Sequence, residues 1–150
     1  MNIRQSTNRH RHEYSLELEQ VKQKFDYFLI VDFEATCDVR TKVDPQEIIE
    51  FPCLKLNTKT LEIDSTFHQF VKPEAHPILT PFCMELTGIN QSMIEKQPNF
   101  LETLSLFQNW MTREGLVKNT KLEEEAPPYN YAFITCGEWD FKWLLHRLVV

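Results

Sequence analysis

The alternation of apolar and polar residues in the first half of the chain predicts three β-strands. Residues 27–33 form a nearly continuous apolar run, which is typical of a buried strand. Residues 47–57 are rich in β-forming side chains, and residues 61–71 alternate with period two, as a half-buried strand does. A polar turn over residues 57–60 joins the last two. We therefore expect an antiparallel meander.

The second half of the chain shows helical spacing. Residues 81–88 begin with proline and end with glycine, which is typical of a short helix. Asn90 can cap another short helix. The clearest helix follows Asn99, because Glu102 completes a relative of the capping box, and Gly115 ends it.

A further strand and a further helix are predicted near the end of the sequence. Residues 131–135 have the composition of a strand, residues 138–148 place apolar side chains on one helical face, and residues 116–128 form a charged loop. The order βββαβα predicts an α/β domain over residues 25–150, with a mixed sheet flanked by helices. Residues 1–24 are polar, and we expect a flexible arm there.

Composition narrows the class of protein. The chain is 42% hydrophobic with 11 Phe, enough for a core, and no apolar run approaches the ~20 residues that span a bilayer. We expect no membrane association. The four cysteines lack a C-x-x-C pair, which argues against structural zinc and for reduced thiols in an intracellular protein, cytoplasmic or nuclear. The net charge of −6 disfavours tight non-specific binding to duplex nucleic acid, although bound metals can invert the local field.

Three carboxylates point to metal chemistry. Asp32 and Glu34 end a buried strand, and residues two apart share a face, so their like charges need compensation. Mg²⁺ and Mn²⁺ prefer such oxygens. Asp140 follows a strand, where ligands of α/β sheets bind, and it meets the pair if that strand lies beside the first. The alternatives are a strand end turning into solvent and, for Asp140, a helix-start residue favoured by the macrodipole.

Four motifs in order carry a resemblance to a known family. They are Asp32-Phe33-Glu34-Ala35-Thr36-Cys37, Glu47-Ile48-Ile49-Glu50-Phe51-Pro52, Phe82-Cys83-Met84-Glu85-Leu86-Thr87-Gly88-Ile89 and Thr135-Cys136-Gly137-Glu138-Trp139-Asp140. Over residues 25–145 the chain resembles the Eri-type 3′–5′ exoribonucleases, in the DEDDh branch of the DnaQ-like exonucleases. The resemblance implies an α/β fold of RNase H type, a mixed sheet flanked by helices.

The resemblance also implies roles for particular residues. Asp32 would bridge two Mg²⁺ ions, for which Mn²⁺ substitutes, Glu34 would be a direct ligand, and Asp140 would act through a bound water. Two metals can activate the attacking water and stabilise the leaving 3′ oxygen. The implied nucleotide-binding residues are Phe33, Ala35, Thr36, Leu86, Thr87, Gly88 and Ile89. Among them, Leu86 and Ile89 could stack on the terminal base, and Gly88 allows close backbone approach.

The family's third motif, a histidine that acts as general base and a later aspartate ligand, has no counterpart here. After Asp140 the sequence contains His146 and no further acidic residue, and we expect His146 to be a helix-surface residue. We therefore expect a C-terminally truncated domain without its general base.

The sequence thus predicts a metal-dependent exoribonuclease that releases nucleoside 5′-monophosphates from single-stranded RNA 3′ ends, impaired in this chain. The alternative hypotheses are a non-catalytic module that binds RNA ends or a protein, and an unstable product. No motif identifies a protein partner.

Overall fold

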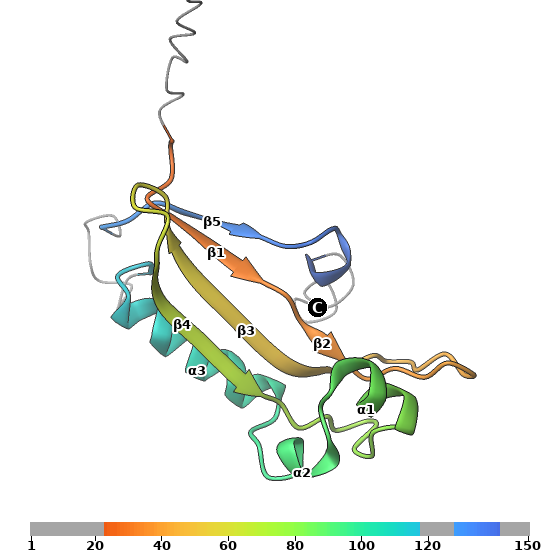
Figure 1. Cartoon of the computed structure of the whole chain (residues 1–150). Helices are drawn as coiled ribbons and strands as arrows, with labels where there is room; N and C mark the ends of the chain where they lie inside the picture. Colours follow the sequence, from red (N-terminus) through yellow and green to blue (C-terminus); the bar gives the residue numbers. More distant parts are fainter. Residues whose placement is uncertain (1–22, 118–127, 142–150) are drawn as a thin grey trace, which may run out of the picture.

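In the computed structural model of the chain, residues 23–117 and 128–141 are described, and they form a mixed five-stranded sheet with helices packed against it (Figure 1). The elements in chain order are β1 (Tyr27–Val31), β2 (Glu34–Ala35), β3 (Ile48–Asn57), β4 (Ile63–Phe70), α1 (Pro81–Thr87), α2 (Gln91–Ile94), α3 (Phe100–Arg113) and β5 (Tyr131–Ile134).

The long strand β3 organises the sheet. It pairs with β4 along one edge and with β1 and then β2 along the other, always antiparallel, which confirms the predicted meander. The strand β5 pairs in parallel with β1, from Tyr27 opposite Tyr131 to Ile30 opposite Ile134. The fourth predicted strand therefore lies beside the first, which is the condition for Asp140 to approach the other carboxylates.

The first predicted strand is interrupted in a way that the sequence pattern did not indicate. Pairing with β3 stops after Val31 and resumes at Glu34, leaving Asp32 and Phe33 in a gap. The flanking registers, Val31 with Cys53 and Glu34 with Glu50, place Pro52 opposite Asp32. Proline has no N–H to donate to a ladder, so Pro52 accounts for the break in pairing.

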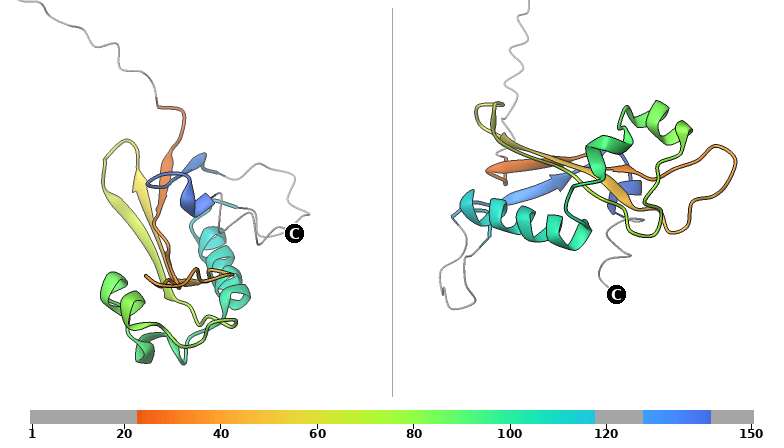
Figure 2. Two further views of the ribbon diagram at one scale, coloured as in Figure 1. Left: turned by 90° about the vertical axis from the view of Figure 1, so that its right-hand side faces the viewer. Right: turned by 90° about the horizontal axis from the view of Figure 1, so that it is seen from below.

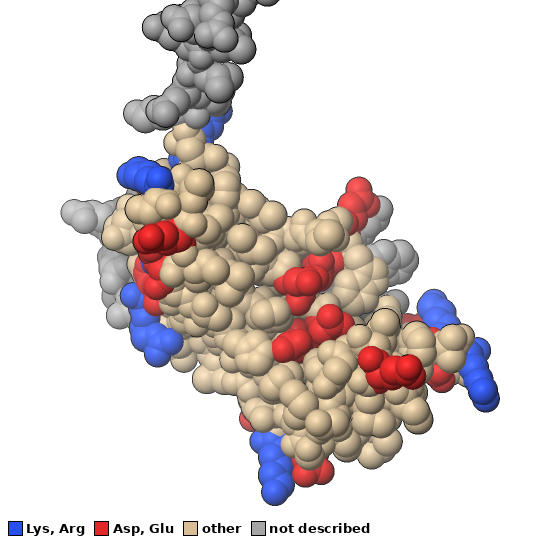
Figure 3. Space-filling view, in the orientation of Figure 1, with Lys and Arg blue, Asp and Glu red and all other residues tan. Residues whose placement is uncertain are grey.

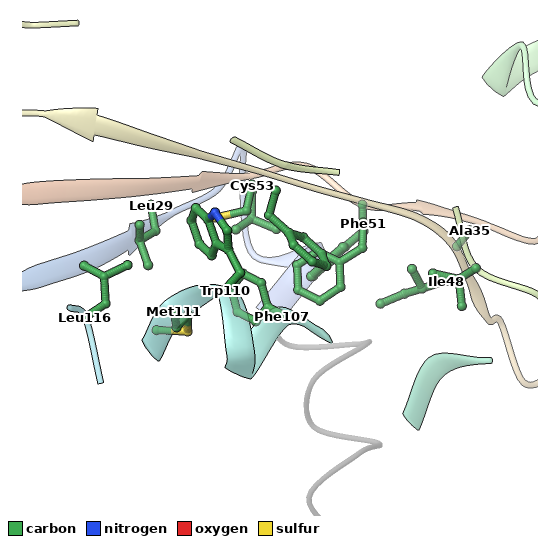
Figure 4. Close-up of a cluster of buried hydrophobic side chains, with 13 residues drawn as sticks. Leu29, Ala35, Ile48, Phe51, Cys53, Phe107, Trp110, Met111 and Leu116 are labelled. Carbon is green, nitrogen blue, oxygen red and sulfur yellow. The ribbon is translucent and has the colours of Figure 1, made fainter. Parts of the chain in front are cut away.

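The main core lies between the sheet and α3. Phe51 of β3 contacts Phe107 of α3 with ring centroids 4.7 Å apart, and Phe107 stacks on Trp110 at 5.5 Å. Figure 4 shows these rings of α3 pointing at the sheet, next to Cys53. The helix begins as predicted, because the Asn99 side chain accepts from the Glu102 N–H in a capping box.

A second, smaller core joins α1 and α2 to one end of β3, on the opposite side of the sheet from α3 (Figure 2). Its buried members are Ile49, Leu79, Cys83, Ile89 and Ile94. Both predicted boundaries of α1 are confirmed: Pro81 follows the cap residue Thr80, and Gly88 ends the helix in the left-handed conformation, at φ 74°.

The predicted helix over residues 138–148 lies only partly within the described residues. Trp139 has helical backbone, and the description ends at Phe141, so His146 falls outside it, as does the predicted arm up to residue 22. No helix in the described part of the chain is long and apolar enough to cross a membrane.

Candidate active site

Asp32 and Glu34 lie on the sheet face opposite α3. Val31, Phe33 and Ala35 are buried in the main core, so the alternation along the strand turns the two intervening acidic side chains the other way. Asp32 is exposed and Glu34 is half-buried. In Figure 3 acidic side chains gather in the middle of this face, over the region where β1 passes into β2 in Figure 1, while Lys and Arg lie near the periphery.

Asp140 is brought to the same place from the other end of the sequence. It lies six residues after the end of β5, and its side chain is buried, at 3% exposure. Its Oδ1 accepts a hydrogen bond of 3.0 Å from the backbone N–H of Phe33. Phe33 lies in the gap between β1 and β2, and its neighbours in the sequence are Asp32 and Glu34. The hydrogen bond therefore holds the Asp140 carboxylate against the backbone between these two acidic residues.

The electrostatics of Glu34 reflect this convergence. Burial raises the pKa of Glu34 above its ordinary value, and the negative charges of Asp32, Glu50 and Asp140 raise it further. Asp32 and Asp140, from opposite ends of the described chain, therefore both act electrostatically on Glu34. The site is a concentration of negative charge that a cation would relieve.

Glu50 is an acidic neighbour of this site to which the sequence analysis gave no role. It pairs with Glu34 in the β2–β3 register, and it accepts a hydrogen bond from His68 of β4. A signal was present, because Glu50 belongs to the second of the four matched motifs. Its position opposite Glu34, however, depends on strand register.

The donors suit a divalent cation in their chemistry, since they are carboxylates. Among residues 23–117 and 128–141, however, no group of three His, Cys, Asp or Glu side chains is arranged so that it could hold a metal ion. The described carboxylates are therefore ligands of the right chemical type, but they do not form a complete metal-binding group by themselves.

The predicted nucleotide-binding segment at the end of α1 divides into accessible and inaccessible residues. Leu86 is 64% exposed, whereas Ile89 is 3% exposed and packs in the second core. Thr87 Oγ1 donates to the Cys83 carbonyl and accepts from the Ile89 N–H, and a Cβ at Gly88 would meet nothing within 4 Å. The stacking expected of both apolar residues is therefore open to Leu86 alone.

The other three residues assigned to nucleotide binding have buried side chains. Phe33 contacts Phe51 with centroids 4.6 Å apart, Ala35 is 6% exposed, and Thr36 Oγ1 accepts a 2.9 Å hydrogen bond from the Glu47 N–H. Their side chains serve the fold. A nucleotide contact at these positions stays a prediction.

Two of the four free cysteines have thiols that are hard to ionise. Burial raises the pKa of both Cys37 and Cys53 to about 12, so these two thiols stay protonated at neutral pH. The reduced state of the thiols and a cytoplasmic or nuclear location stay predictions.

Comparison with known proteins gives this arrangement a context. The exonuclease family model matches residues 29–144, which include Asp32, Glu34 and Asp140. The human protein named ERI1 exoribonuclease 3 is 51% identical over 123 residues, which are 82% of this chain and 34% of that protein. The chain thus spans about a third of the length of this curated relative.

Solved structures agree. The nuclease domain of 3'hExo, described as a DEDDh family member bound to rAMP, superposes with a TM-score of 0.71 at 39% identity, over 82% of this chain and 57% of that one. A 3'-exonuclease described in 3'-end specific recognition of histone mRNA stem-loop gives a TM-score of 0.71 at 38% identity, over 81% of this chain and 39% of that one. These neighbours confirm the predicted RNase H-like fold, in a metal-dependent family. The chain belongs to the exonuclease family and, within it, to the Eri-type 3′–5′ exoribonucleases.

Proposed function

We propose that this chain provides the nuclease fold of a metal-dependent exoribonuclease that removes nucleoside 5′-monophosphates from RNA 3′ ends. The observation that carries the proposal is the meeting of Asp32, Glu34 and Asp140 at the break between β1 and β2. The three residues come from the two ends of the described chain, and all lie within the span that matches the exonuclease family.

Mg²⁺ is the proposed cofactor, with Mn²⁺ able to substitute, and Asp32 and Glu34 are the residues that would hold it directly. When bound, a metal pair activates water and stabilises the leaving 3′ oxygen. The Phe33 N–H holds Asp140 in one orientation, which suits a carboxylate that would accept a hydrogen bond from a metal-bound water. Relief of the like-charge repulsion at Glu34 favours cation binding.

The proposed substrate is a single-stranded RNA end with a free 3′-hydroxyl. RNA is supported by the relatives, one of which is described in the recognition of a histone mRNA stem-loop. A single-stranded end needs no unpairing before it enters a site. The exposed Leu86 at the end of α1 offers an apolar surface for the terminal base.

A second candidate function is a non-catalytic module that binds an RNA end or a protein. The observation that favours it is that no group of three His, Cys, Asp or Glu side chains among residues 23–117 and 128–141 is arranged to hold a metal ion. Such a module would bind RNA ends without cleaving them rapidly.

The test compares the 150-residue chain with the same chain joined to the downstream part of human ERI1 exoribonuclease 3. Both proteins receive 5′-labelled RNA ending in a 3′-hydroxyl or a 3′-phosphate, and a circular RNA, with Mg²⁺. We expect stepwise shortening of the 3′-hydroxyl RNA by the fusion, roughly 10²–10⁴-fold slower shortening by the chain alone, and none by either Asp32→Asn variant.

Two results would count against the exonuclease. Internal cleavage of the circular RNA would show another reaction, and shortening that survives Asp32→Asn would show another site. Metal-dependent retention of 3′ ends without shortening by either protein would support the binding module instead.

A further inference from the structure

Glu50 is a half-buried carboxylate at the centre of the sheet, next to the proposed metal site. It lies opposite Glu34 in the β2–β3 register, and directly opposite residues in antiparallel strands have Cβ atoms about 5 Å apart. The exposed fraction of its side chain is 22%. Its charge therefore acts on Glu34 through a partly desolvated environment, and it contributes to the raised pKa of Glu34.

His68 fixes the orientation of this carboxylate from the neighbouring strand. The distance from His68 Nε2 to Glu50 Oε1 is 2.5 Å, and an ionised carboxylate can only accept, so the imidazole N–H is the donor. The His68 ring also meets the Phe70 ring edge-on, with centroids 4.9 Å apart. The imidazole thus has two described contacts, and it engages one of the two Glu50 oxygens.

In the described part of the chain, no lysine or arginine forms an ion pair with Glu50. The lysines there that form ion pairs are Lys42, Lys55 and Lys59, and each pairs with an acidic residue other than Asp32, Glu34, Glu50 or Asp140. Placing one half-buried carboxylate beside another costs free energy unless their charges are compensated. A divalent cation bound at the neighbouring Glu34 would compensate them.

We propose that Glu50, oriented by His68, is a positioning residue that raises the affinity of the Asp32–Glu34 site for its divalent cation. In this role Glu50 would accept hydrogen bonds from cation-bound water through the oxygen that His68 leaves free. Such outer partners commonly change metal affinity by about 10–100-fold when they are removed. The proposal rests on the proposed function, because it assumes that Asp32 and Glu34 bind the metal.

The test measures Mn²⁺ binding to the full 150-residue chain by isothermal titration calorimetry, together with thermal melting of each variant without metal. Glu50→Gln removes the charge and keeps the shape and an acceptor for His68. His68→Phe removes the N–H donor and keeps the ring beside Phe70. Glu62→Gln removes one charge from the exposed β3–β4 turn as the matched control, and Asp32→Asn tests the site itself.

We expect Glu50→Gln to raise the Mn²⁺ dissociation constant about tenfold, His68→Phe to raise it by a smaller factor, and Glu62→Gln to leave it unchanged. Equal affinities for Glu50→Gln and Glu62→Gln, with binding lost in Asp32→Asn, would overturn the role of Glu50 alone. If Asp32→Asn also binds Mn²⁺ like the wild type, the proposed metal site fails and this role fails with it. Should Glu50→Gln melt too low to titrate, wild-type affinity in His68→Phe would overturn the proposal.

Discussion

Leu86 and Ile89 are three residues apart but lie in opposite environments, at 64% and 3% exposure. The left-handed turn at Gly88 separates them, since it ends α1 and sends the chain back into the second core. Motif matching alone treats both as base-stacking candidates. Their burial distinguishes them: a nucleotide can reach the exposed Leu86, whereas Ile89 packs in the second core and holds α1 in place.

This difference predicts opposite phenotypes for two alanine variants. Leu86→Ala should weaken binding of a terminal nucleotide by ~1–3 kcal/mol, the usual value of a base-stacking contact, with little change in stability. Ile89→Ala should lower the free energy of unfolding by about 2–4 kcal/mol because it leaves a cavity. Urea denaturation and fluorescence titration with a short RNA measure the two quantities. A stable Ile89→Ala protein that loses nucleotide binding would reverse the assignment.

The pKa of Glu34 makes a prediction about pH. Because the folded-state pKa is raised above the ordinary 4.5, Glu34 favours folding when it is protonated, and this contribution is lost as pH rises through the folded pKa. Above the folded pKa, the charged form of Glu34 therefore destabilises the metal-free protein.

Glu34→Gln should accordingly raise the melting temperature at neutral pH, and the gain should shrink toward zero as the pH falls below the ordinary value. Divalent metal should stabilise the wild type more than Glu34→Gln. Melting curves recorded from acidic to neutral pH, with and without Mn²⁺, give both comparisons. A melting temperature that falls on Glu34→Gln at neutral pH would contradict the direction of the shift.

At the level of elements, periodicity and capping residues were enough to predict the long strands and α3. Period-two alternation indicated β4, and the Asn99 and Glu102 pair indicated the start of α3. The strand β2 was missed because two residues carry no periodicity. The gap before it depends on Pro52 of another strand, which only the register brings opposite.

The site was predictable to a similar extent. Asp32 and Glu34 stand out from sequence because two charges end an apolar run. Glu50 lies within a matched motif, but the pattern of the sequence alone gives it no role, because one acidic residue on a half-buried strand is usual on a solvated face. Its importance arises from pairing with Glu34, and its orientation from His68 on a third strand.

The hydrogen bond that crosses the gap gives Asp140 a structural role as well as an electrostatic one. Asp140→Ala should lower the free energy of unfolding by about 1–3 kcal/mol, because it leaves the buried Phe33 N–H without its acceptor. Asp140→Asn should keep most of that stability, since its amide oxygen can accept, while it weakens Mn²⁺ binding. Chemical denaturation and calorimetry separate the two effects. Equal stability of Asp140→Ala and wild type would show that the bond contributes nothing.

At the scale of the whole molecule, the negative charge of the protein opposes the binding of a negatively charged RNA. The chain has a net charge of −6, and its acidic side chains gather on the open sheet face (Figure 3). An RNA phosphate would be repelled there unless cations change the local field. The protein's affinity for RNA should therefore depend on the kind of cation present as well as on ionic strength.

We expect single-stranded RNA to bind more tightly in Mg²⁺ than in NaCl of equal ionic strength, and Asp32→Asn to lose most of that difference. Fluorescence anisotropy with a labelled RNA measures it under conditions where cleavage is slow. Identical binding in the two salts would mean that screening alone governs association.

The parallel pairing of β5 with β1 bears on how the protein folds. The strands β1, β3 and β4 are near in sequence and can pair early, whereas β5 joins β1 only after a segment of about 100 residues has been enclosed as a loop. Asp140 follows β5, so its carboxylate reaches the other acids at the end of this slow closure. We expect pulse-labelling hydrogen exchange during refolding to protect the β3 amides before the Phe33 amide, so that the chain acquires its sheet first and its repelling charges last.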